Sequence, residues 1–137
     1  MNGYLRRRSR LITALAVALA LALLVAVVRF YLWPAPPSVD ATMALSLVVV
    51  VDRFWDANSL DQQEPIPEND WPPEIRRLAP KSVMCSKEGL YIMLGSFFVR
   101  EWGLFVLPSR SAFRPPAKGD PSYRQLEGRV YWYQIEG

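Results

Sequence analysis

The pattern of hydrophobic and polar positions divides the chain into one long apolar run, one amphipathic stretch and several short apolar segments. The long run, residues 11–28, has Thr13 as its one polar side chain. Eighteen helical residues span roughly 27 Å at about 1.5 Å each, close to the hydrocarbon thickness of a bilayer. Arg29 and three aromatic residues follow, as is typical of a membrane interface. The pattern predicts a transmembrane helix over residues 11–33.

The basic residues that precede this run are Arg6, Arg7, Arg8 and Arg10. Lysine and arginine accumulate in cytoplasmic segments, so residues 1–10 are predicted to form a cytoplasmic tail and residues 34–137 an extracytoplasmic domain. A cleaved signal peptide begins with the same kind of basic segment and is the alternative. The Ala-x-Ala sites lie inside the apolar run, which favours an uncleaved, single-pass signal anchor.

The cysteine and glycosylation signals bear on the compartment. The chain has one cysteine, Cys85, so it forms no internal disulfide, and it has no Asn-x-Ser/Thr site. These two features favour a bacterial inner membrane with a periplasmic domain over a membrane of the secretory pathway. Burial as a small apolar side chain is the expected state of Cys85.

Residues 39–58 carry their polar side chains at helical spacing, namely Thr42, Ser46, Arg53 and Asp56. The opposite stripe is apolar and wide enough to pack on a sheet. The pattern predicts a helix over 39–58, with Ser38 or Asp40 as its cap. Four consecutive valines leave a buried strand over 45–52 as the alternative.

A proline-rich connector, DQQEPIPENDWPP, follows this helix, and PEIRRLA then predicts a short helix with proline in its first turn. Residues 38–80 are therefore predicted to form the helical part of the domain. Residues 81–137 are predicted to form its sheet.

The stretch 89–107, GLYIMLGSFFVREWGLFVL, is apolar enough to raise the question of a second membrane span. A span would bury the adjacent Arg100 and Glu101, at about 2.5–3.5 kcal/mol each near the bilayer centre. Its glycines weaken a helix but suit tight turns in SKEG, GS and REWG. The prediction is a meander of short strands, with Arg100 and Glu101 at a hairpin tip. RVYWYQI predicts the last strand, with Tyr131 and Tyr133 facing opposite to Trp132.

Together these elements predict an α+β fold, in which two helices pack on one face of a four- or five-stranded antiparallel meander sheet. The segment 108–128 between the last two strands is predicted to be a long connector, because prolines interrupt it.

Charge and composition narrow the function. The five arginines at and before the predicted span leave 11 lysines and arginines against 13 acidic residues, so no nucleic-acid partner is predicted. The chain has no histidine, one cysteine and no phosphate-binding glycine loop, so no cofactor, no metal and no enzymatic activity are predicted. A hydrolase built on the connector carboxylates Glu64, Glu68, Asp70 and Glu74 is the weakest hypothesis.

Two functional hypotheses remain. The first is a membrane-anchored accessory module that contacts another membrane or envelope protein, and the alternative is an envelope domain that binds a glycan or peptide on an aromatic sheet face. Core packing of the aromatic residues is the simpler explanation of their number. The candidate interaction surface comprises Trp102, Arg100, Arg110, Arg114 and Tyr123.

Overall fold

The computed structural model describes residues 2–32, 34–57 and 64–137, and the chain separates into two compact units, Met1–Ala35 and Pro36–Gly137. The first unit is a single helix, α1 (Asn2–Leu32). Its segment Ile12–Arg29 is long and apolar enough to cross a membrane, and a signal sequence near an N-terminus has the same properties. Trp33, at the end of the predicted span, lies outside the described residues.

The second unit begins with α2 (Ala41–Ala57), so the predicted helix is confirmed and the alternative strand over 45–52 is wrong. Of the two predicted caps, Asp40 is the one observed: its carboxylate accepts the N–H of Met43 at 2.7 Å. Residue 58, the predicted end, lies outside the described residues. The valines are accommodated in a helix because Val50 and Val51 are buried in the core while Val49 points outward, 53% exposed.

A short irregular segment joins α2 to the sheet. It contains β1 (Glu64–Pro65), the 3-10 turn η1 (Glu68–Asp70) and α3 (Pro73–Arg76), which begins with proline as predicted. Ile75 is fully buried, and the Trp71 indole N–H donates to the carbonyl of Ile66 at 2.8 Å. Residues 61–63 of the predicted connector lie outside the described residues.

The sheet is antiparallel, six-stranded and ordered β1-β2-β3-β4-β6-β5. Its longer strands are β2 (Ser82–Cys85), β3 (Leu90–Phe97), β4 (Arg100–Val106), β5 (Ser122–Glu127) and β6 (Val130–Ile135). The α+β prediction is confirmed, but the strand count and the simple meander are wrong. β5 lies in the segment predicted as a connector, and β6 inserts between β4 and β5.

The glycines explain why the predicted hairpin tip is also wrong. SKEG is a turn, with Ser86 and Gly89 exchanging backbone hydrogen bonds, but Gly95 lies within β3 and Arg100 and Glu101 lie within β4. The tip is instead Phe98–Val99. A Cβ on Gly103 would overlap the carbonyl of Ile92, and one on Gly95 would overlap the Trp102 indole. These glycines allow close approach between strands and do not mark turns.

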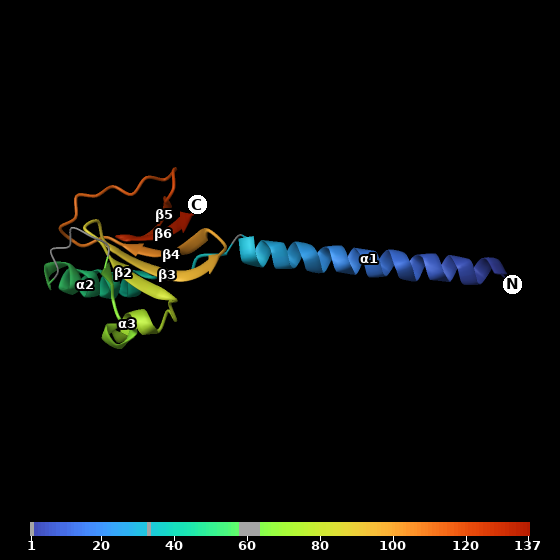
Figure 1. The fold of residues 1–137 in the computed structure, drawn as a ribbon, viewed down its shortest axis with the longest axis horizontal. Coiled ribbons are helices and arrows are strands. Elements are labelled where there is room, and N and C mark those ends of the chain that lie inside the picture. Colours follow the sequence, from blue (N-terminus) through green and yellow to red (C-terminus); the bar gives the residue numbers. More distant parts are fainter. Residues whose placement is uncertain (1, 33, 58–63) are drawn as a thin grey trace. The chain divides into compact units, whose positions relative to one another are not determined.

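The two faces of the sheet have different covers, as Figure 1 shows for the second unit: α2 and α3 lie on one side, and the connector from β4 to β5, in orange, lies on the other. On the helix-covered face Leu47 and Ile75 pack against Ile92, Leu104 and other apolar strand residues. The opposite face holds a separate cluster, whose buried members are Tyr91, Phe105, Leu107, Tyr123 and Tyr133. The predicted alternation of Trp132 and Tyr133 between the faces is confirmed.

Candidate functional site

A groove of about 700 Å³ opens on the sheet face that the helices leave uncovered. Strand residues supply half of its lining, and residues of the connector segment 113–121 form the other wall. We call it the tyrosine groove; its lining consists of Met84, Glu88, Tyr91, Glu101, Phe113, Pro116, Gly119, Asp120, Pro121, Tyr123, Tyr133 and Ile135.

Its floor and sides are aromatic. The rings of Tyr91 and Phe105 lie 4.6 Å apart between centroids, and Phe105 and Tyr123 lie 5.1 Å apart. Tyr133 meets Tyr91 edge to face at 5.2 Å. Phe113, from the connector, packs edge to face on Phe105 at 5.9 Å. Each such pair adds about 0.5–1.5 kcal/mol beyond area burial, so the cluster fixes the connector over the sheet.

Two hydroxyl groups meet across the groove. Tyr91 on β3 and Tyr123 on β5 are separated by two intervening strands, yet their oxygens lie 2.6 Å apart. Tyr91 also lies 3.4 Å from a carboxylate oxygen of Glu88. When Tyr91 donates to Glu88, Tyr123 donates to Tyr91. This short chain of hydrogen bonds orients both rings.

The third hydroxyl is different. Tyr133 is 1% exposed, and its oxygen has no hydrogen-bond partner among the described residues. An unpaired buried hydroxyl costs about 1–3 kcal/mol relative to a satisfied one. Buried polar groups without partners are rare in folded proteins and call for an explanation such as a bound water or ligand.

All three tyrosines have a raised pKa. Burial, which disfavours the phenolate, is the main cause for each. For Tyr91, the hydrogen bond with Tyr123 raises the pKa further, and for Tyr133 the negative charge of Glu101 does so. The groove therefore presents neutral phenols at physiological pH, which donate and accept hydrogen bonds.

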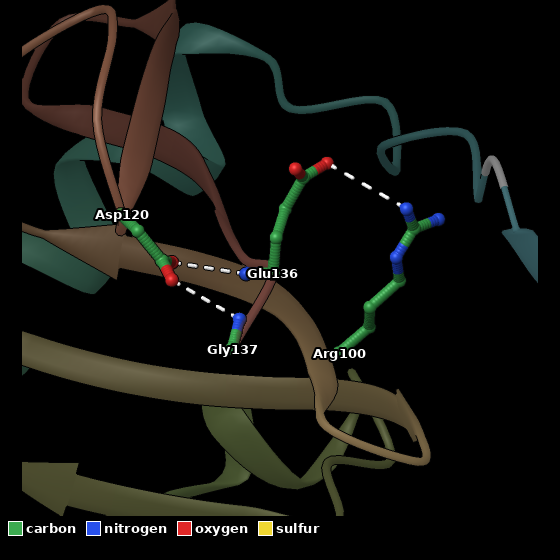
Figure 2. Close-up of polar contacts among 4 residues, drawn as sticks. All are labelled: Arg100, Asp120, Glu136 and Gly137. Atoms are coloured by element: carbon green, nitrogen blue, oxygen red, sulfur yellow. Dashed lines mark hydrogen bonds and ion pairs between the residues drawn. The ribbon is translucent and has the colours of Figure 1, made fainter.

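The charged groups that line the groove are all acidic: Glu88, Glu101 and Asp120. Asp120 has a structural role, because its two carboxylate oxygens accept the backbone N–H groups of Glu136 at 2.9 Å and Gly137 at 3.0 Å. Figure 2 shows these two bonds, together with the 3.9 Å ion pair between Glu136 and Arg100. Asp120 thus fastens the chain after β6 to the end of the connector.

Further hydrogen bonds hold the connector where it leaves β4. Asp52 on α2 accepts the backbone N–H of Ser109 at 2.8 Å and its hydroxyl at 2.6 Å. The guanidinium of Arg129 donates to the carbonyl of Pro108 at 2.8 Å. These contacts hold the connector where it leaves β4, and the bonds of Asp120 hold its other end, so the connector wall of the groove is fixed at both ends.

The structure does not bring the predicted interaction residues together. Tyr123 lies in the groove, whereas Trp102 packs half-buried on the helix-covered face, over Gly95. Arg100 pairs with Glu136, and Arg110 and Arg114 are exposed on the connector. The side chains of the orienting arginines Arg6, Arg7, Arg8 and Arg10 lie outside the described part.

Sequence reasoning included Tyr133 among the aromatic residues of a possible binding face but missed Tyr91, Glu88 and Glu101 as site residues. The signal was the period of a strand: in LYIML, Tyr91 faces opposite to Leu90 and Ile92, and in VYWYQI, Tyr131 and Tyr133 face opposite to Trp132. The acidic residues of the connector before α3, including Glu64 and Asp70, do not line the groove. Within the described residues, no group of three or more histidine, cysteine or acidic side chains is placed to hold a metal ion. Cys85 is buried, and burial raises the pKa of its thiol.

A second surface feature is the tip of the β3–β4 hairpin. Phe98 is 91% exposed and has a left-handed backbone conformation, with φ 54°. Its ring meets that of Phe97 edge to face at 4.7 Å. The tip is apolar but convex, and it contributes nothing to the groove.

Comparisons with known proteins add no functional assignment. No protein-family model, curated protein sequence or solved structure matches this chain.

Proposed function

We propose that this chain is a single-pass membrane-anchored protein whose extracytoplasmic α+β domain is a non-catalytic binding module, with the tyrosine groove as its ligand site. Among the two functional hypotheses, this is the envelope domain that binds a ligand on an aromatic sheet face. The apolar segment of α1 and the arginines before it support the anchor and its orientation.

The observation that carries the proposal is the unpaired hydroxyl of Tyr133 at the base of the groove. On the same strand, Trp132 is buried in the helix-covered core and Tyr131 is partly exposed, so Tyr133 is the tyrosine of β6 whose hydroxyl is buried. A polar atom left without a partner inside a lined groove is what a preformed binding site offers to a ligand before it arrives. The absence of histidine from the sequence leaves the groove without the usual acid–base and nucleophile pairs of hydrolases, which supports binding without turnover.

Site-specific photo-cross-linking in intact membranes tests the groove. A benzophenone amino acid is placed at Met84 or Ile135, which line the groove, and at Arg53, an exposed control on α2. The same adduct is expected from both groove positions and none from Arg53. Adducts that arise from Phe98 but from neither groove position would contradict the proposal and favour the accessory module, with the hairpin tip as its contact.

A reporter fusion tests the anchor. A reporter active only outside the cytoplasm, joined after Gly137, is expected to be active and to fractionate with membranes. Activity in the soluble extracytoplasmic fraction would show that the apolar segment is a cleaved signal sequence. A cytoplasmic signal would overturn the orientation.

A further inference from the structure

The ligand class can be narrowed if the groove is accepted as the binding site of the proposed function. We infer that the tyrosine groove receives the ammonium group of a lysine side chain presented by a partner polypeptide. Four properties of the groove lead to this assignment: its charge, its aromatic walls, its depth and the spacing of its carboxylates.

The charge of the lining favours a cation. Three carboxylates line the groove, and the lining includes neither lysine nor arginine. Asp120 is engaged by two backbone N–H groups, whereas the hydrogen bond shown for the Glu88 carboxylate within the described part of the chain is the 3.4 Å contact with Tyr91. Glu88 and Glu101 therefore keep acceptor capacity for an incoming ammonium, which is a donor at three positions.

The aromatic walls suit the same group. A cation over the face of a tyrosine or phenylalanine ring is attracted by the ring quadrupole, and the attraction grows when the site is desolvated. Tyr91, Tyr123 and Tyr133 surround the groove with such rings, and Phe113 closes it from the connector. The apolar side chains of Met84 and Ile135 also line it and can contact a methylene stem.

Depth selects lysine. The Tyr133 oxygen is buried beneath its neighbours, so a ligand group reaches it only when adjacent side chains move, and a slender group requires the smallest movement. An ammonium on a four-carbon stem is compact and can enter while the peptide backbone stays outside. The amine of an amino sugar is joined directly to its ring, so the whole ring would have to enter. The planar guanidinium of arginine is wider. Once inside, the ammonium donates a hydrogen bond to the Tyr133 oxygen.

The spacing of the carboxylates argues against a metal ion. Within the described residues, no three acidic, histidine or cysteine side chains converge to hold one. Glu88 follows β2 and Glu101 lies in β4, and phenol rings lie between them. An organic cation with several donors fits dispersed acceptors better than a metal that needs ligands at about 2–2.5 Å.

The test uses the full chain in nanodiscs of zwitterionic lipid, with ¹³C-labelled methionine and isoleucine methyl groups as reporters. The probe is an acetylated, amidated Ala-Lys-Ala peptide, and the matched control carries acetyl-lysine at the central position. We expect the lysine peptide to shift the methyl signals of Met84 and Ile135 saturably. Met43 and Ile92, on the helix-covered face, are expected to stay unchanged.

Variants locate the interaction. Glu101→Gln and Tyr133→Phe are each expected to weaken binding of the lysine peptide roughly tenfold, because the first removes a negative charge that attracts the ammonium and the second removes a hydroxyl that accepts its hydrogen bond. Glu127→Gln, an exposed carboxylate outside the groove, is the matched control and is expected to leave affinity unchanged. Raising the salt concentration is expected to weaken binding of the lysine peptide.

Several outcomes overturn the inference. One is that neither groove methyl responds to the lysine peptide; another is that the acetyl-lysine control binds as well, or that Glu101→Gln binds as tightly as the unmodified chain. If a glucosamine tetramer bound more tightly than the lysine peptide, the ligand would be an amino glycan and not a polypeptide. A shift of Met84 and Ile135 by N-acetylated chitotetraose alone would reject the lysine ligand and keep the groove as a binding site. Failure of the groove cross-links would reject the proposed function itself.

Discussion

The two faces of the sheet are formed by the same strands but differ in the side chains they carry and in what covers them. On the helix-covered face, the contacts between α2 and the strands are apolar, and side chains such as Leu47 and Leu104 are completely buried. On the opposite face, tyrosines take the alternate positions. The hydroxyls of Tyr91 and Tyr123 meet each other, that of Tyr91 also meets a carboxylate, and that of Tyr133 has no partner in the described part of the chain. One face therefore supplies stability, and the other combines packing with polar groups that are available for binding.

This division follows from the period of a strand. Successive side chains point to opposite faces, so Ile92 and Trp132 join the helix-covered core while their neighbours Tyr91 and Tyr133 line the groove. The covers differ as well. A regular helix with a wide apolar stripe buries one face, whereas a connector with few apolar side chains covers the other only in part.

The largest expected effect is the loss of folding stability at alkaline pH, which arises from the tyrosines of the groove face. Unfolded tyrosines lose their proton near a pKa of 10, whereas Tyr91, Tyr123 and Tyr133 keep it to higher pH in the fold. The unfolded state then binds fewer protons, so their contribution is complete below pH 10 and is lost as pH rises above it. Between the unfolded and the folded pKa of a tyrosine, the loss is about 1.4 kcal/mol per pH unit. Urea unfolding of the full chain in micelles, between pH 8 and 12, measures it.

The double variant Tyr91→Phe, Tyr123→Phe is the control for this titration. It removes two of the three tyrosine protons, so the alkaline slope of stability is expected to decrease and to retain the contributions of Tyr133 and the buried Cys85 thiol. An unchanged slope would show that the loss arises elsewhere in the chain.

Cavity formation on the helix-covered face has the next largest expected effect. Leu47→Ala removes a fully buried side chain between α2 and the sheet, and we expect a loss of about 2–5 kcal/mol in the free energy of unfolding. Leu45→Ala, on the outer side of the same helix and 69% exposed, is expected to change it by less than about 0.5 kcal/mol. Chemical denaturation of both variants at neutral pH compares them. Equal effects would contradict the assignment of this face as the main source of stability.

The helix-covered face was the more predictable of the two. The spacing of polar residues in 39–58 predicted α2 correctly, and the Asp40 cap and the proline at the start of α3 followed from local rules. The alternation in RVYWYQI assigned Tyr133 and Trp132 to opposite faces. These are effects within one helix turn or one strand, which a sequence shows directly.

The groove depends on contacts that are distant in sequence. Gly95 and Gly103 leave room for the Trp102 indole and for the neighbouring strand. Tight turns also select glycine, so the sequence alone could not distinguish the two causes and the hairpin tip was misplaced. β5 was missed because SYRQLE is polar on its outward side and follows a proline-rich segment. The connector returns across the sheet to bring Tyr123 to Tyr91, and no local pattern encodes that 32-residue closure.

A smaller effect of opposite sign is expected at Tyr133. Tyr133→Phe removes the unpaired hydroxyl without changing the ring, so we expect the free energy of unfolding to rise by about 1 kcal/mol. Tyr91→Phe is the matched control: it breaks the 2.6 Å bond to Tyr123 and is expected to lower stability by about 1 kcal/mol. Thermal and urea unfolding at pH 7 measure both. A loss of stability in Tyr133→Phe would show that the hydroxyl has a partner in the free protein.

The smallest effect is expected at the hairpin tip, which belongs to neither face. Phe98 holds a left-handed φ of 54°, a conformation that costs a non-glycine residue about 1 kcal/mol, while its side chain is 91% exposed. Phe98→Gly is therefore expected to raise the free energy of unfolding by up to about 0.5 kcal/mol, because the relief of strain exceeds the loss of the contact with Phe97. Phe98→Ala removes the ring but keeps the strain, so it is expected to give no gain. Urea midpoints of the two variants separate backbone from side chain, and a loss above about 1 kcal/mol in both would show that the exposed ring is packed in solution.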